Sequence, residues 1–158
     1  MEAKERLDTR DICIRRTLKG SLIEAVTATA LIAFWAMDLW LYTRPEGLSR
    51  GRMAFDLFMT AMSVLLLWMA YHPRMFFWRK NPFSNLRQID LYADMARWCG
   101  LGVSVAMIVM NGSRITRLPW LHSLASWVFM AVGIIYSIYY NRIRKAGELP
   151  KEDDYEMD

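Results

Sequence analysis

SLIEAVTATALIAFWAMDLWLY, residues 21–42, decides the fold class of this chain because it is almost entirely apolar. The hydrocarbon core of a bilayer is roughly 30 Å thick, and an α-helix of about 20 apolar residues can cross it. Three further stretches have the same character, and they cover residues 53–71, about 94–110 and 119–140. We therefore expect an all-α polytopic membrane protein, folded as an antiparallel bundle of four transmembrane helices joined by short connections.

The expected domain boundaries follow from these stretches. We predict four helices, at about 21–43, 53–71, 86–111 and 119–141. Together they form a transmembrane domain of residues 21–141. Residues 1–20 form either a basic cytoplasmic arm or a helix that lies on the membrane interface, and both interpretations stay open. Residues 142–158 form a charged cytoplasmic tail, whose acidic end is typical of disorder.

Composition favours a membrane protein over a nucleic-acid-binding one. Apolar residues make up 54% of the chain, and the 23% that are charged gather in the termini and connections. The net charge of +4 comes from Lys and Arg at the segment ends. Anionic lipid headgroups and membrane topology account for basic residues in those places. We expect membrane lipid as a partner and no nucleic acid.

The distribution of Lys and Arg also predicts an orientation. The N-terminal arm, the connection at 73–86 with Arg87, and the tail together carry fourteen of these residues. The connections at 43–52 and 111–118 carry five. Because cytoplasmic connections are enriched in Lys and Arg, we expect both termini and the connection at 73–86 to be cytoplasmic.

Each predicted helix carries polar residues along one face, which predicts an inward polar seam. A charge at mid-membrane costs at least about 2.5 to 3.5 kcal/mol on insertion scales, so such residues mark candidate sites. The candidates for an intramembrane polar site are Glu24, Asp38, Asp56, Asp90, Asp94, Arg97 and His122. Ser104 and Asn111 continue the stripe of the third helix. In the fourth helix, Ser126, Gly133 and Ser137 share the face of His122 and would let helices approach closely.

The role of Arg97 has two interpretations. In the first, Arg97 pairs with Glu24 of the first helix, or the two form a site for a charged substrate or a proton. In the second, Asp94 neutralises Arg97 from three positions earlier on the same helix. We favour the second interpretation, in which the pair is structural.

No catalytic residue, cofactor or metal site is predicted. Asp38, Asp56 and His122 could ligate a divalent cation, but they form no tight ligand motif, and loop arginines are available as partners. Cys13 and Cys99 are isolated, which excludes a paired-thiol oxidoreductase. The sequence has no phosphate-binding glycine loop, no HExxH and no nucleophile elbow. We expect a protein that is not an enzyme.

One connection resembles that of a known family. The residues that carry the resemblance are His72-Pro73-Arg74-Met75-Phe76, Asn81-Pro82, Gln88, Tyr92 and Arg97, which lead into an apolar helix. They resemble small bacterial membrane proteins related to the SdpI immunity proteins, over about residues 40–142. The connection at 43–52 departs from that family because it contains no His. The resemblance implies a bacterial cytoplasmic membrane and a role in toxin resistance or signalling, with no catalytic residues to carry over.

Two functions from different classes remain. The first is a non-enzymatic integral membrane protein that acts by association, as an accessory subunit or a resistance or signalling component. It would form a homo-oligomer or a complex with other membrane proteins. The alternative is a small ion-coupled or proton-coupled transporter or channel, in which Glu24, or Asp38 with Asp56, binds the ion.

Overall fold

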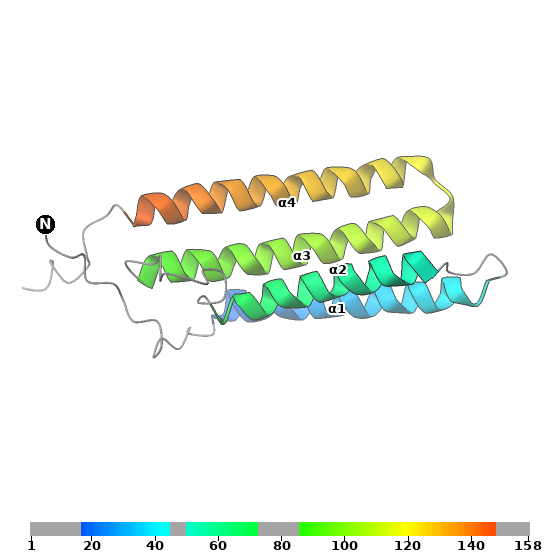
Figure 1. The fold of residues 1–158 in the computed structure, drawn as a ribbon, viewed down its shortest axis with the longest axis horizontal. Coiled ribbons are helices and arrows are strands. Elements are labelled where there is room, and N and C mark those ends of the chain that lie inside the picture. Colours follow the sequence, from blue (N-terminus) through cyan, green and yellow to red (C-terminus); the bar gives the residue numbers. More distant parts are fainter. Residues whose placement is uncertain (1–16, 45–49, 73–85, 148–158) are drawn as a thin grey trace, which may run out of the picture.

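The chain folds into four long α-helices, and the computed structural model describes them at residues 17–44, 50–72 and 86–147 (Figure 1). The helices are α1 (Leu18–Tyr42), α2 (Arg50–Met69), α3 (Leu86–Thr116) and α4 (Pro119–Ala146). All four are long and apolar enough to cross a membrane. The expected all-α class with four such helices is therefore confirmed. The expectations for the N-terminal arm, the connection at 73–85 and the tail from residue 148 lie outside the described residues.

The helices continue beyond their apolar stretches. α2 begins at Arg50, α3 continues to Thr116 and α4 continues to Ala146, each several residues outside the boundary that hydropathy predicts. The added residues of α4 include Arg, Lys and Ala, which are good helix formers, so its backbone hydrogen bonding need not stop where the apolar residues stop. This extension brings charged side chains onto the helices themselves.

Local sequence explains where the helices begin and turn. Thr17 caps α1, because its hydroxyl oxygen accepts a hydrogen bond from the Gly20 amide at 3.1 Å. Between α3 and α4 the chain reverses at Arg117, which has a left-handed φ of 56°. Pro119 then starts α4, where the missing amide hydrogen costs nothing because the first turn has no partner for it.

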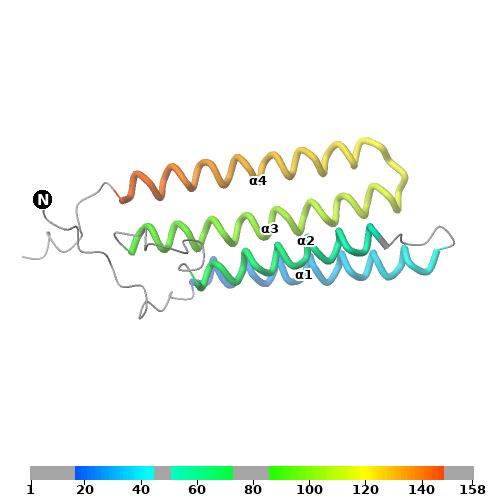
Figure 2. The backbone as a smooth tube through the Cα atoms, viewed as in Figure 1, coloured from blue at the N-terminus to red at the C-terminus, as the bar shows by residue number. Residues whose placement is uncertain are grey.

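α3 is the central helix of the molecule. α1 and α2 pack against it on one side and α4 packs against it on the other, as the ribbon and the backbone tube both show (Figures 1 and 2). α3 is accordingly the most buried helix and α4 the least. The polar residues of α3 are therefore the ones enclosed on more than one side.

The apolar core lies along both sides of α3. Towards α1, Phe34 packs with Val103 and Met107. Towards α4 and α2, a second cluster of Ile89, Tyr92, Met95 and Cys99 contacts Leu66, Met69, Val132, Ile135, Tyr139 and Ile143. Glycines set the close approaches: a Cβ on Gly100 would lie 3.4 Å from the Ser63 carbonyl oxygen of α2.

The orientation of α4 differs from the sequence expectation. The residues expected on its inward face are His122, Ser126, Gly133 and Ser137, and all four are exposed. α4 instead packs through an apolar face, and Val132 occupies the space that a Cβ on Gly102 of α3 would need. The serine hydroxyls donate to carbonyl oxygens one turn earlier in α4 itself. They therefore need no partner helix, and the inward polar face expected for this helix was wrong.

Candidate functional site

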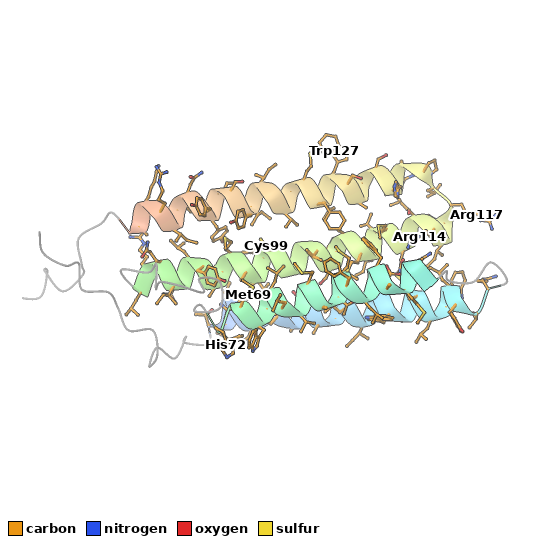
Figure 3. The ribbon with its side chains drawn as sticks, viewed as in Figure 1. Met69, His72, Cys99, Arg114, Arg117 and Trp127 are labelled. Carbon is orange, nitrogen blue, oxygen red and sulfur yellow. The ribbon has the colours of Figure 1, made fainter. Side chains whose placement is uncertain are left out.

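Two clusters of charged and polar side chains join α1, α2 and α3. The Arg97 cluster consists of Lys19, Glu24, Tyr71, Asp94 and Arg97. The Arg52 cluster consists of Asp38, Arg52, Asp56, Asn111 and Arg114. The two clusters lie at opposite ends of the helices. In Figure 3, His72 marks the end that holds the Arg97 cluster, and Arg114 marks the end that holds the Arg52 cluster.

Glu24 and Arg97 form the centre of the Arg97 cluster. Arg97 Nε donates to Glu24 Oε1 at 2.7 Å, and the Tyr71 hydroxyl donates to the same oxygen at 2.5 Å. The guanidinium also lies 5.2 Å from the centre of the Tyr71 ring, a cation–π distance. Gly20 makes room for it, since a Cβ there would lie 2.8 Å from Arg97 Cζ. The Arg97 side chain therefore depends on contacts from α1 and from the turn that follows α2.

Asp94 is the weaker partner of Arg97. Its Oδ1 lies 3.9 Å from Arg97 Nη1, whereas its Oδ2 accepts a hydrogen bond from Lys19 Nζ at 2.7 Å. The interpretation that Asp94 alone neutralises Arg97 therefore needs correction. α1 lies alongside α3, so it brings Glu24 to the Arg97 guanidinium, while Asp94 is divided between two cations.

Asp90 lies at the edge of the Arg97 cluster without joining its ion pairs. It is exposed and lines a cleft of about 510 Å³ together with Lys19, Arg87 and Asp94. Arg97 also lines this cleft, and its Nη2 is buried with no hydrogen-bond partner among the described residues. The cleft therefore contains groups of both charges.

Arg52 holds the second cluster together. Its Nη2 donates to Asn111 Oδ1 at 2.8 Å and to Asp38 Oδ1 at 3.3 Å, while its Nε donates to Asp56 Oδ2 at 3.3 Å. Asn111 Nδ2 donates to Asp38 Oδ1 at 2.9 Å. Arg114 Nη1 donates to Asn111 Oδ1 at 3.2 Å. All three helices are cross-linked by this one set of contacts.

The carboxylates of the Arg52 cluster are almost fully enclosed. Asp38 is 3% exposed and Asp56 is 1% exposed. Two arginines face these two carboxylates, so the formal charges of the cluster cancel. Asp56 Oδ1 is buried without a hydrogen-bond partner among the described residues. Burying charge is costly unless it is paired, and here Arg52 supplies the pairing for both carboxylates.

A serine pair lies between the two clusters. The hydroxyl oxygens of Ser63 and Ser104 are 2.7 Å apart, and each hydroxyl donates to the Gly100 carbonyl oxygen at 3.0 Å. On α3, Arg97, Ser104 and Asn111 are seven residues apart, which places them on one face of the helix. All three are buried. This part of the polar stripe expected on the helix thus faces α1 and α2, whereas Asp90 is exposed.

His122 is not part of either cluster. It lies on the exposed face of α4, whereas Asp38 and Asp56 are joined through Arg52 on the other side of α3. Within residues 17–44, 50–72 and 86–147, no three His, Cys, Asp or Glu side chains are grouped so that they could hold a metal ion. The structure does not bring together the three possible metal ligands.

Sequence reasoning missed the roles of Arg52 and Tyr71. Arg52 was placed in a connection, yet it lies four residues before Asp56, the spacing of an ion pair within a helix. A predicted second helix that began one turn earlier would have placed Arg52 within ion-pair distance of Asp56. Tyr71 is the last residue of the predicted second helix, and no local signal indicates its bond to Glu24.

Together, the fold and the clusters define a small all-helical chain with four helices able to span a membrane and a polar interior shared by three of them. Comparison with known proteins found no matching family model, no matching curated protein and no matching solved structure. Function is therefore argued from the geometry of the described residues.

Proposed function

We propose that this chain is a non-enzymatic integral membrane protein that acts by association with other membrane proteins, as an accessory subunit or a resistance or signalling component. Its helices would form an antiparallel bundle with both termini in the cytoplasm, as the distribution of Lys and Arg favours. The resemblance to the SdpI-related proteins supports a bacterial cytoplasmic membrane. Three properties of the described residues support association.

The exposed face of α4 carries the proposal. The polar face of α4, defined by His122, Ser126, Gly133 and Ser137, is exposed, and no atom lies within 4 Å of a Cβ built on Gly133. The serine hydroxyls are satisfied within α4, so the small size of these residues is what favours a partner helix here. Small residues at this spacing let a second helix approach closely, and close packing is what drives helix association in a bilayer.

Large apolar side chains flank this face on one side. Trp127, Met130 and Ile134 are exposed, and Trp127 points away from α3 (Figure 3). Aromatic residues and Met are enriched in the buried centres of protein interfaces. A neighbouring helix could thus pack its backbone against Gly133 and contact these apolar side chains.

The interior supports the same function. Buried Asp38 and Asp56 are engaged by Arg52, and Arg97 is engaged by Glu24. A carboxylate already neutralised by a fixed arginine is a poor binding site for a cation, because the cation would have to displace that arginine. The polar core therefore suits a structural role that holds α1, α2 and α3 together.

Association is tested by purification in mild detergent with measurement of the mass of the complex. We expect the wild-type chain to purify as a stoichiometric oligomer or hetero-complex, and Gly133→Leu to lose it. Ala131→Leu is the matched control, since Ala131 is also small and exposed but lies on a different side of α4. Equal behaviour of the two variants, or a monomeric wild-type chain, would refute association through α4.

The transporter alternative has one observation in its favour, the unpartnered Oδ1 of Asp56. Vesicles containing the purified chain can be assayed for proton or cation flux. Flux that Asp56→Asn abolishes while the fold remains intact would replace association with transport as the function.

A further inference from the structure

A cleft between the start of α3 and the end of α4 is lined by basic and apolar side chains. It has a volume of about 340 Å³, and Arg87, Leu91, Arg142, Lys145 and Ala146 line it. Three of these five side chains are basic and none is acidic. The two helices that form the cleft lie side by side along their length (Figures 1 and 2).

Within the part of the chain that the structure describes, these cations make no ion pairs. Among the described residues, neither Arg87 nor Lys145 has a carboxylate within ion-pair distance. The Arg142 guanidinium lies 5.9 Å from the centre of the Tyr139 ring, which leaves its hydrogen-bond donors available. Arg52 and Arg97, in contrast, are engaged by carboxylates in the two ion clusters. The cleft therefore has positive charge available for an external anion.

The walls of the cleft are held in place by a buried side chain. Gln88 Nε2 donates to the Ile143 carbonyl oxygen at 2.9 Å, and Gln88 is buried. Arg87 and Arg142 each neighbour one of these two residues in sequence. The bond therefore fixes the backbones that carry both cations relative to each other. The positive dipole end of α3 and the negative dipole end of α4 both lie at this cleft and offset each other, so its positive charge comes from the basic side chains.

A neighbouring cleft is less suited to binding an anion. The cleft of about 510 Å³ shares Arg87 and Leu91 with this one, but Asp90 and Asp94 also line it. Their carboxylates would repel a phosphate. The cleft between α3 and α4 contains no such group and is the better anion site.

The position of the cleft indicates a lipid. It lies at the ends of two helices long enough to span a bilayer, which is the level of the phospholipid headgroups. Exposed Ile138 lies one turn before Arg142 on the same side of α4 and offers an apolar surface for an acyl chain. Basic pockets between transmembrane helices are suited to anionic headgroups.

We propose that this cleft binds the phosphate group of an anionic phospholipid, through Arg87, Arg142 and Lys145. The inference rests on the proposed membrane location but not on association with a partner. A bound lipid would contact both α3 and α4 at the end where the hydrogen bond from Gln88 to Ile143 already links them.

The test is native mass spectrometry of the full chain in detergent, titrated with phosphatidylglycerol or with phosphatidylcholine. We expect the wild-type chain to retain phosphatidylglycerol selectively, and Arg87→Gln/Arg142→Gln to bind it on the order of 30-fold more weakly, at about 1 kcal/mol for each basic residue removed. Arg44→Gln/Arg144→Gln is the control. It removes the same charge and also one cation–π contact, that of Arg44 with Trp40, from residues that do not line the cleft.

Each result decides the proposal. Selective loss in the cleft variant, with the control unchanged, supports it. Equal loss in both variants shows that only net charge matters and overturns it. Displacement of the lipid by millimolar inorganic phosphate shows a free-anion site and overturns the lipid assignment. The assay uses the purified chain alone, so a failure of association through α4 leaves its result unchanged.

Discussion

Replacement of Glu24 by Leu should be one of the most destabilising changes in this protein. Arg97 is only 3% exposed and would lose the oxygen that its Nε contacts at 2.7 Å. Removing one partner of a buried ion pair costs about 3 to 5 kcal/mol, because the other charge stays buried. The Glu24 side chain is 25% exposed and Asp94 stays 3.9 Å from Arg97, so we expect the low end, about 3 kcal/mol.

A second salt bridge supplies the control. Lys19 and Asp94 are also 2.7 Å apart, but the Lys19 side chain is 58% exposed. Exposed pairs contribute about 0 to 1 kcal/mol, so Lys19→Met should change stability little. The assay is reversible unfolding in mixed micelles with increasing dodecyl sulfate, followed by circular dichroism and tryptophan fluorescence.

The double variant Glu24→Leu/Arg97→Leu separates pairing from packing. Replacing both partners of a buried ion pair by apolar residues is often neutral, so the double variant should lie within about 1 kcal/mol of the wild-type chain. The reasoning is refuted if Glu24→Leu costs no more than Lys19→Met. It is also refuted if the double variant loses the sum of its two single variants.

Two further predictions concern local packing. Gly20→Ala should destabilise the fold by about 1 to 3 kcal/mol, because the new Cβ would lie 2.8 Å from Arg97 Cζ. Gly112→Ala should stabilise the fold by about 0.5 to 1 kcal/mol, because nothing lies within 4 Å of the new Cβ and Ala is the better helix former. The same unfolding assay measures both, and similar effects at the two positions would contradict the packing. In a Cys13→Ser background, Cys99 should react with a maleimide only after unfolding, since it is buried in the core; rapid labelling of the folded chain, followed by mass spectrometry, would contradict this.

The polar stripe of α3 shows how far sequence periodicity reached. Ser104 and Asn111 were expected on the face of Arg97, and the structure buries all three. Heptad spacing is enough to assign residues to a common helix face. Heptad spacing does not predict which helix packs against that face, so the sequence left both Glu24 and Asp94 as possible partners of Arg97.

α4 shows where periodicity fails. Its polar face, including Ser126 and Ser137, was as well defined in sequence as that of α3, yet it is exposed. Serine can satisfy its hydroxyl within its own helix, so a polar stripe need not turn inward. The fit of Val132 against Gly102 selects the apolar face instead, and that fit exists only once the two helices are in contact.

Sequence by itself determined the number and class of the helices, because hydropathy over about 20 residues is a local property that needs no partner. It also determined which residues share a face. The tertiary structure decided that α3 is central, that Arg52 joins two carboxylates, and that α4 shows its polar side outward. These outcomes depend on distances between helices, which are set by side-chain packing at positions such as Gly100 and Gly102 rather than by any pattern along the chain.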